Sequence, residues 1–243
     1  MKLSQSSPAR IIKSVPFFNK LNPQEAAALT HRMVFRTFGS GRVIFHHGDP
    51  GGLLYIIIKG KVKITHTTAE GQEALLAIMG EGDFFGELAL LDDSPRSATA
   101  EAVSETETLT LHREEFIQFI RGNPDFSLHV LHTLAQHIRR LNSQLSDVFF
   151  LDLPARLART LLLLADQHGR QAADGTLIDL VLTQTDLAEM TGTTRVSINK
   201  SLGLFRRAKW VSTKGRKFTI RNRQALQDFI QVSGRSMPTQ RDD

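Results

Sequence analysis

The sequence predicts an α+β fold: a β-rich N-terminal domain, a long connecting helix and a C-terminal domain of short helices. Between residues 35 and 112, short apolar runs alternate with glycines, as in strands joined by tight turns. Between 131 and 148 apolar residues recur at helical spacing, and between 182 and 208 two short helical segments flank Gly192. We therefore expect three segments with these bounds: 1–122, 123–151 and 152–243.

Composition narrows the class of protein before any motif is considered. The chain of 243 residues has no cysteine, which excludes disulfides, thiolate nucleophiles, Cys-ligated zinc and Cys-held iron–sulfur clusters. Residues 1–15 lack the apolar core of a secretory signal, and no apolar run reaches the ~18 residues of a membrane span. We therefore expect a cytoplasmic protein with no membrane partner.

The charge of the chain is unevenly distributed. Residues 153–243 hold 15 Lys and Arg against 8 Asp and Glu, a net charge of +7, whereas residues 1–152 hold 15 against 17, a net charge of −2. This asymmetry indicates that the C-terminal part meets a polyanion. Ordinary surface charge is the alternative interpretation.

The N-terminal part begins with a helix and continues as strands. Asn22 is a suitable N-cap, and Pro23 a suitable first helical residue, for a helix over 22–33. The runs LLYIII (53–58) and KVKI (61–64) that follow are typical of strands.

Residues 84–98, FFGELALLDDSPRSA, place a carboxylate and a guanidinium on either side of a short segment. Glu87 can accept hydrogen bonds from a sugar hydroxyl, and Arg96 offers a planar fork of donors that fits a phosphate. Gly86 lets the backbone approach a ligand closely, and Ser97 adds a hydroxyl and an N–H group. Together these groups predict a site for a nucleotide with a single phosphate. The alternative is an all-β domain in which Glu87 and Arg96 form only a salt bridge.

A helix is expected to end at Gly122, and Pro124 then starts a longer one. The longer helix carries an apolar heptad seam of Leu131, Leu134, Ile138, Leu141, Leu145 and Val148. Polar neighbours such as Arg139, Arg140 and Asn142 favour an interface between two subunits over packing against the β domain. Asp152 as N-cap, with Pro154 in the first turn, then begins a new helix.

Residues 182–208 have the pattern of a helix-turn-helix. Thr183 can cap a first helix, Gly192 permits a sharp turn, and Thr194 can cap a second helix. Either Val196 or Ile198 supplies the first packing position of the second helix. The N-terminal turn of such a helix approaches base edges in the major groove of DNA.

Arg195, at the start of the second helix, can bond guanine O6 and N7 together and is the first candidate for base readout. In VSTKGRKFTIRNRQAL (211–226), Gly215 lies between basic residues, which predicts a wing hairpin whose Lys214, Arg216 and Lys217 neutralise phosphates. A solvated turn is the alternative. The candidate DNA contacts are Thr183, Thr185, Thr194, Arg195, Val196, Ser197, Asn199, Lys200, Lys214 and Arg216.

These motifs resemble the Crp–Fnr family of transcription regulators. FGEL…RSA is similar to the phosphate-binding cassette of cyclic-nucleotide-binding domains, and FLDLPARLARTLL (150–162) to the family's junction before its DNA-binding domain. The resemblance implies a cyclic-nucleotide-binding β-roll (jelly roll), a long dimerisation helix and a C-terminal winged helix-turn-helix. It also implies a non-enzymatic homodimer that binds a pseudo-palindromic operator and RNA polymerase. The ligand-binding residues that it implies are Gly86, Glu87, Leu88, Arg96, Ser97 and Asn142.

Resemblance to the cAMP-responsive members makes cAMP the expected allosteric effector. Their phosphate and ribose contacts match, but the two hydroxyl residues that meet the base in those members fall on Leu141 and Asn142. Leu141 cannot form a hydrogen bond, whereas Asn142 can donate and accept, so cGMP, a cyclic dinucleotide or no ligand stay open. The recognition helix also departs from the family pattern, because Val196 replaces an acidic base reader and Lys200 replaces an arginine. Val196 can at most touch a thymine methyl.

Two other classes of protein are disfavoured. A cyclic-nucleotide regulatory module without DNA binding has no use for residues 182–223. An enzyme motif such as HExxH, GxSxG or GxxxxGK[ST] does not occur. His129, His132 and His137 fit solvated or interface positions on the long helix, so neither a metal nor a haem is expected.

Overall fold

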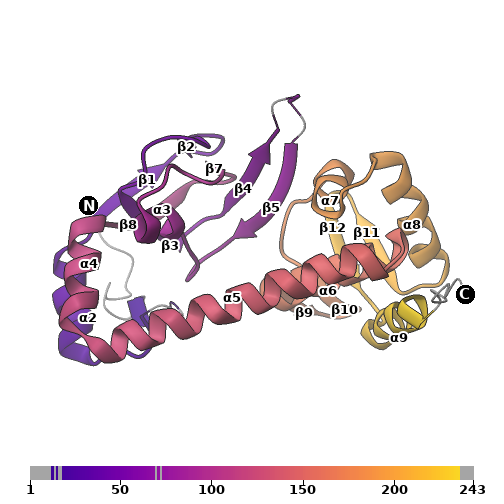
Figure 1. The fold of residues 1–243 in the computed structure, drawn as a ribbon. Coiled ribbons are helices and arrows are strands. Elements are labelled where there is room, and N and C mark those ends of the chain that lie inside the picture. Colours follow the sequence, from indigo (N-terminus) through magenta and orange to yellow (C-terminus); the bar gives the residue numbers. More distant parts are fainter. Residues whose placement is uncertain (1–11, 14, 16–17, 69, 72, 236–243) are drawn as a thin grey trace, which may run out of the picture. The chain divides into compact units, whose positions relative to one another are not determined.

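The computed structural model describes residues 12–13, 15, 18–68, 70–71 and 73–235. They belong to two compact units that divide between Arg139 and Arg140, inside helix α5 (Pro124–Phe150), and each unit is described by itself (Figure 1). Within the described residues, none of the helices has both the length and the apolar character of a bilayer span.

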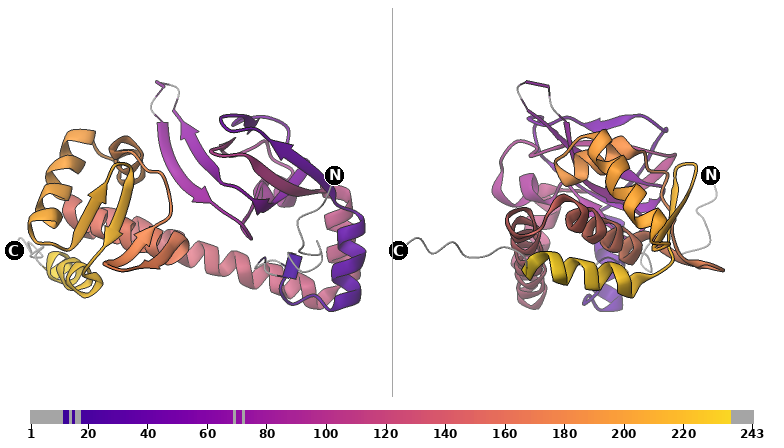
Figure 2. Two further views of the ribbon diagram at one scale, coloured as in Figure 1. Left: turned by 180° about the vertical axis from the view of Figure 1, so that it is seen from behind. Right: turned by 90° about the vertical axis from the view of Figure 1, so that its right-hand side faces the viewer.

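The first unit contains two four-stranded antiparallel sheets, which Figure 2 shows from two further directions. One has the strand order β1-β8-β3-β6 and the other β2-β7-β4-β5. This arrangement confirms the predicted β-roll. The strands are β1 (Val34–Phe38), β2 (Val43–Phe45), β3 (Leu53–Lys59), β4 (Val62–Thr67), β5 (Glu73–Met79), β6 (Phe84–Phe85), β7 (Thr99–Ala102) and β8 (Thr106–His112).

Strand β3 contributes to both apolar clusters of this unit, because successive side chains of a strand point to opposite faces. Tyr55 and Ile57 belong to the cluster that also holds residues of the other sheet, whereas Leu54 and Ile56 belong to the cluster shared with the helices. Burial on both faces explains why the run LLYIII is apolar throughout rather than alternating.

The cluster that contains Leu54 and Ile56 also includes residues of helices α2 (Pro23–His31) and α4 (Arg113–Gly122) and of the start of α5. Asn22 caps α2 as expected, and the side chain of Glu25 accepts from the N–H of Asn22 to complete a capping box. Phe126, in the first turn of α5, stacks on Phe18 with ring centroids 5.7 Å apart. The start of α5 is therefore part of the core of the first unit.

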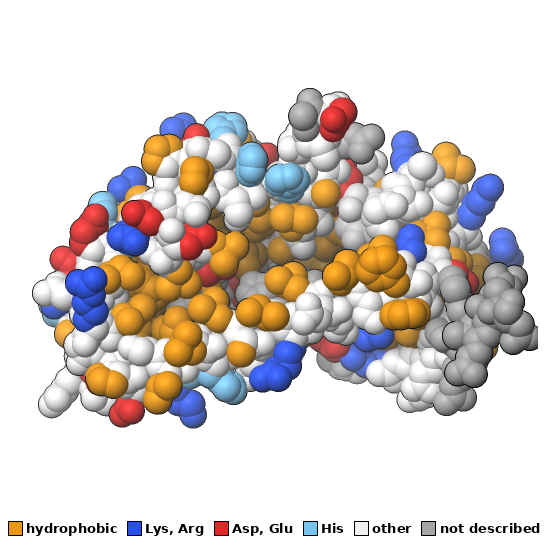
Figure 3. Space-filling view, viewed as in Figure 1, with side chains coloured by type: hydrophobic (Ala, Val, Ile, Leu, Met, Phe, Trp, Pro, Cys, Tyr) orange, Lys and Arg blue, Asp and Glu red, His pale blue; other side chains and the backbone are white. Residues whose placement is uncertain are grey.

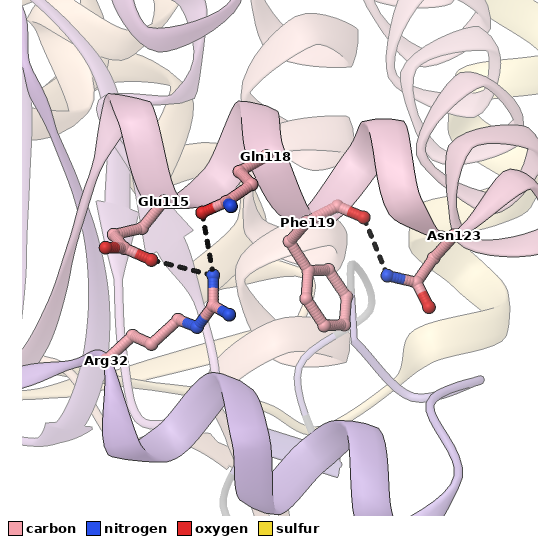
Figure 4. A network of polar contacts seen from close by, with 5 residues as sticks. All are labelled: Arg32, Glu115, Gln118, Phe119 and Asn123. Carbon is pink, nitrogen blue, oxygen red and sulfur yellow. Dashed lines mark hydrogen bonds and ion pairs between the residues drawn. The ribbon is translucent and has the colours of Figure 1, made fainter.

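Polar contacts join the end of α2 to α4, and another lies at the C-terminal end of α4 (Figure 4). Arg32 Nη1 donates to Glu115 Oε2 at 2.8 Å and to Gln118 Oε1 at 3.3 Å. The side chain of Asn123 donates to the carbonyl oxygen of Phe119 at 2.7 Å, which satisfies one of the free carbonyl groups at the end of α4. These bonds fix the corner from which α5 departs.

The second unit packs three helices around α6, with a four-stranded sheet of order β11-β12-β10-β9. Buried leucines and alanines line α6, which packs against α7, α8 and α9. The elements are α6 (Leu153–His168), β9 (Gly169–Ala172), β10 (Gly175–Ile178), α7 (Gln184–Thr191), α8 (Arg195–Arg207), β11 (Val211–Lys214), β12 (Lys217–Ile220) and α9 (Arg223–Arg235).

Two elements of this unit were not predicted. The hairpin of β9 and β10 has few apolar residues, and its Gly175 is required by position, since an added Cβ would lie 2.1 Å from the carbonyl oxygen of Ile220. Helix α9 begins at Arg223, inside the segment 211–226 that was expected to form the wing. Asn222, which accepts from the N–H of Ala225 at 3.0 Å, and the buried Leu226 and Ile230 are the signals that could have indicated it.

Candidate functional site

The cassette lies where strand β6 turns into the short helix α3 (Glu87–Asp92). Gly86 makes this turn in the left-handed region, with φ of 83°. A Cβ at Gly86 would lie 2.5 Å from Arg96 Nη1 and 3.0 Å from the carbonyl oxygen of Leu53. Glycine is therefore needed both for the backbone conformation and for the approach of the guanidinium.

Helix α3 is held against the loop between β2 and β3 by a second close approach. A Cβ at Gly51 would lie 2.2 Å from the Cβ of Ala89, so α3 rests on the backbone of this loop. Glu87, Ala89 and Leu90 are buried, whereas Leu88 is 49% exposed. Of the predicted ligand-binding residues, Leu88 and Ser97 are thus on the surface and Glu87 is inside.

Arg96 is 3% exposed and crosses from the cassette to strand β3. Its Nη1 donates to the carbonyl oxygen of Gly86 at 2.9 Å, and its Nη2 to that of Leu53 at 2.8 Å. The guanidinium carbon lies 4.2 Å above the centroid of the Phe45 ring, which adds a cation–π contact. The guanidinium is therefore held in a single orientation before any ligand binds.

Burial dominates the electrostatics of the pair. Desolvation raises the pKa of Glu87, and the backbone hydrogen bond at Glu87 and the charge of Arg96 oppose this shift. Desolvation lowers the pKa of Arg96, against the charges of Tyr55, Glu87 and Asp49, but a guanidinium stays protonated in proteins. No ion pair joins Glu87 to Arg96 among the described residues, so the alternative of a simple salt bridge does not hold.

The donors of Arg96 fit a phosphate. A guanidinium has five N–H donors, and the two backbone carbonyls take one from each terminal nitrogen. Arg96 Nε is buried and has no hydrogen-bond partner among the described residues. A buried unpaired donor costs stability, which a phosphate oxygen would relieve.

The Gly86→Ala variant tests this close packing. We expect it to unfold more easily than the wild type, by about 1–3 kcal/mol from overpacking in addition to the strain of a left-handed alanine. Gly41→Ala is the matched control, because Gly41 has φ of 77° but open space around its Cβ position. Urea unfolding of both variants measures the difference. Equal losses of stability would show that Arg96 moves aside without cost.

The apolar seam of α5 is confirmed as a helical face, and Figure 3 shows hydrophobic side chains along it. Leu134 packs against the core of the first unit, but the other five seam residues are more than half exposed. Leu128 lies seven residues before Ala135, and Phe149 lies seven residues after Asn142. Both therefore fall on the same side of the helix and widen the apolar face. Apart from Leu134, the seam residues are thus exposed on α5, which favours an interface between subunits. Asn142 lies on this face in the second unit, and its contact with a ligand stays a prediction.

Arginine side chains of α6 link this helix to the end of α5. Arg159 Nη2 pairs with Asp147 Oδ1 at 3.1 Å, and Arg156 Nη1 donates to the carbonyl oxygen of Leu151 at 3.2 Å. Burial raises the pKa of Asp147, and the charge of Arg159 opposes this shift. Asp152 caps α6 as predicted. The angle between the end of α5 and α6 is thus fixed by side chains of both helices.

The helix-turn-helix has the predicted caps and turn. Thr183 caps α7 in a capping box with Asp186, Gly192 has φ of 64°, and Thr194 caps α8 through the N–H of Ser197. Ile198 is fully buried whereas Val196 is 66% exposed, so the structure resolves which of the two packs inward. Arg195, Val196, Asn199 and Lys200 are all exposed on α8.

Two residues absent from the predicted set hold Asn199. Gln184 Nε2 and Arg206 Nη2 each donate to Asn199 Oδ1 at 3.4 Å. The side-chain oxygen of Asn199 is thereby engaged, and its amide nitrogen is the group that can face DNA. Arg206 lies two turns after Asn199 on α8, a spacing of seven residues that the sequence itself shows, whereas Gln184 reaches Asn199 from α7 only through tertiary packing.

The wing is the hairpin of β11 and β12, which turns at Gly215 with φ of 62°. The N–H of Leu182 donates to the carbonyl oxygen of Arg216 at 3.0 Å, which ties the wing to the start of the helix-turn-helix. Lys214 and Arg216 are exposed, whereas Lys217 Nζ lies 3.5 Å from Asp179 Oδ1. Lys214 and Arg216 are therefore freer to meet phosphates than Lys217.

Comparison with known proteins identifies both halves of the chain. Residues 35–123 match the cyclic nucleotide-binding domain, and residues 155–229 match the Crp-like helix-turn-helix domain. The chain is 36% identical over 216 residues to the CRP-like cAMP-activated global transcriptional regulator of Mycobacterium tuberculosis, covering 89% of this chain and 96% of that protein. It is 35% identical over 191 residues to the cyclic AMP receptor protein of Thermus thermophilus, covering 79% and 85%.

A solved structure agrees with these sequence relatives. The crystal structure of the Thermus thermophilus catabolite activator protein matches with a TM-score of 0.52 at 31% identity, covering 90% of this chain and 99% of that one. The order of the two domains, their match to family models and the identity to curated regulators lead to one assignment. The chain belongs to the Crp–Fnr family of cyclic-nucleotide-responsive transcription regulators.

Proposed function

We propose that this protein is a homodimer that binds cAMP in its β-roll and a pseudo-palindromic operator through its winged helix-turn-helix. RNA polymerase is its proposed partner at the promoter, and we assign it no catalytic step. The observation that carries the ligand site is Arg96, which is 3% exposed and whose Nε has no partner in the part of the chain that the structure describes. The proposed domain bounds remain 1–122, 123–151 and 152–243.

The cassette side chains have complementary tasks in this proposal. The free N–H groups of Arg96 would bind the equatorial oxygens of a cyclic phosphate, and the buried carboxylate of Glu87 would accept from the ribose hydroxyl. Ser97 would add a hydroxyl from the surface side. The curated relatives whose names include cAMP share 36% and 35% identity with this chain, which supports cAMP over other cyclic nucleotides.

Calorimetric titration of nucleotide-free protein tests the ligand. Micromolar binding of cAMP at about one site per chain is the expected result, with cGMP and a cyclic dinucleotide titrated in parallel. Heat from cGMP or the dinucleotide alone would change the assigned base. If none of the three releases heat, the result would indicate that the protein binds DNA without a nucleotide.

Asn142 is the proposed link between ligand and DNA. A ligand shifts an equilibrium only by its different affinity for the two states, so some group outside the cassette must sense the base. Asn142 is the polar position on an otherwise apolar face, where an amide can donate to a base and accept from it.

We therefore expect Asn142→Ala to reduce the effect of cAMP on DNA affinity by about tenfold, the value of one lost hydrogen bond to the base. Anisotropy titrations of labelled operator with and without cAMP measure the ratio of affinities. Ser143→Ala, a neighbouring change, is the control. An unchanged ratio in Asn142→Ala would rule out this coupling route.

On the DNA side, the proposal gives the first turn of α8 the task of base readout. Arg195 is exposed at its first position and can take a guanine. Val196, which is 66% exposed, offers a methyl-sized apolar surface to a thymine. Thr183, Thr185, Thr194, Ser197, Lys200, Lys214 and Arg216 then position the domain on the backbone.

A further inference from the structure

Lys209, just beyond the end of α8, has a backbone conformation that lysine rarely adopts. Its φ is 60°, in the left-handed region. The fold requires this conformation, because the N–H of Lys209 donates to the carbonyl oxygen of Arg206 at 3.0 Å and that of Trp210 to Phe205 at 2.9 Å. Such a helix ending normally carries glycine, since any side chain there is strained. A lysine at this position therefore lowers the stability of the domain.

Asp93 provides the comparison within the same chain. It is the other described non-glycine residue with positive φ, at 61°. Its carboxylate pairs with Arg113 Nε at 3.3 Å, which offsets part of the strain. Lys209 is exposed, and none of the described side chains hydrogen-bonds to or pairs with its ammonium group. No contact of the Lys209 side chain with the described part of the domain therefore offsets the backbone strain.

Gly203, in the middle of α8, is the reverse case: it is a glycine at a position where a helix favours other residues. Glycine in a helix interior is about 1 kcal/mol less favourable than alanine. Packing does not demand it, because within the described residues an added Cβ would meet only Arg207 Nη1, at an ordinary contact distance of 3.7 Å. Gly203 lies on one line of α8 with Val196, Lys200 and Arg207, at spacings of three and four residues. This line is opposite the buried Ile198, Leu202 and Phe205.

We propose that the segment Gly203–Lys209 is a second contact with the DNA backbone, beyond the base-reading first turn of α8. Arg207 and Lys209 neutralise phosphates there, and the missing side chain of Gly203 lets the sugar–phosphate strand approach the helix. Both residues disfavour the isolated domain and favour its complex with a polyanion, as expected where function opposes local stability. The inference rests on the proposed DNA-binding function and adds residues that the sequence analysis did not include.

Lys209→Gly is the first test. We expect a higher unfolding midpoint together with weaker DNA binding, about fivefold at 0.15 M salt, because one phosphate contact releases ~0.9 of a counterion. The loss should be equal for an operator selected by the wild-type protein and for a duplex of unrelated sequence. The slope of log affinity against log salt should fall by about 0.9. Lys209→Arg should retain the affinity.

Asp93→Gly is the matched control, since it relieves the same backbone strain in the other unit and should leave both affinities unchanged. Gly203→Ala is the second test. It should raise the unfolding midpoint and weaken binding to both duplexes by about threefold or more. Leu204→Ala, on the flank of the same helix, controls for helix preference.

The outcomes separate the inference from the function on which it rests. If the wild type binds neither duplex, the DNA-binding function itself fails. If the wild type binds but Lys209→Gly changes neither affinity nor salt slope, the second contact is wrong. Unchanged or stronger binding by Gly203→Ala would overturn the close approach at mid-helix.

Discussion

Replacing Arg96 with lysine is expected to raise the Kd for cAMP about 100-fold or more. Lysine keeps the positive charge but offers a single ammonium in place of a planar fork, so it cannot bond two phosphate oxygens in a fixed geometry. Loss of one or two charge-assisted hydrogen bonds is worth about 3 kcal/mol, which corresponds to about 100-fold in Kd. The same change also leaves the carbonyl oxygens of Gly86 and Leu53 without their donors. We therefore expect the stability of the β-roll to fall as well.

Titration calorimetry, with urea unfolding of each sample, separates the two effects of Arg96→Lys. The control is Arg42→Lys, an exposed arginine of the same unit. A folded Arg96→Lys protein that binds cAMP like the wild type would show that Arg96 serves only the fold. A variant that fails to fold would leave the phosphate to be tested through Ser97→Ala, for which we expect weaker binding without loss of stability.

The cassette could be predicted from the sequence because its chemistry is local. Gly86, Glu87 and Arg96 lie within eleven residues, and their types suit a sugar and a phosphate. The orientation of Arg96 could not be predicted, because it depends on a carbonyl group 43 residues earlier in the chain and on the ring of Phe45. Those partners belong to strands of two different sheets, so only the packing of the sheets brings them together.

The DNA-binding half shows the same limit. Caps and turn residues such as Thr183, Gly192 and Thr194 act on their own backbone, so their roles were visible in the sequence. The choice between Val196 and Ile198 was not, since the two differ only in which face of α8 meets the rest of the domain. The bond from Gln184 of α7 to Asn199 of α8 likewise arises between helices. Roles that depend on tertiary contacts needed the structure.

The seam of α5 combines both cases, because its period is local while its proposed partner is a second copy of the chain. Leu145 is 56% exposed and occupies a core position of the heptad, with Ile138 one heptad earlier. We expect Leu145→Asp to raise the dimer Kd about 1,000-fold or more, since it would bring two carboxylates into an apolar interface. Because Leu145 is exposed within the chain itself, the fold of each subunit should persist.

Sedimentation velocity over a range of concentrations measures the dimer Kd of Leu145→Asp, and circular dichroism checks its helix content. Gln136→Asp adds the same charge on the opposite side of α5 and should leave the dimer intact. Operator affinity should fall with the dimer, by about 10²-fold or more, because two linked recognition helices bind a palindrome far more tightly than one. A Leu145→Asp protein that remains a dimer would mean that the subunits associate through another surface. In that case the apolar face of α5 would need a different occupant.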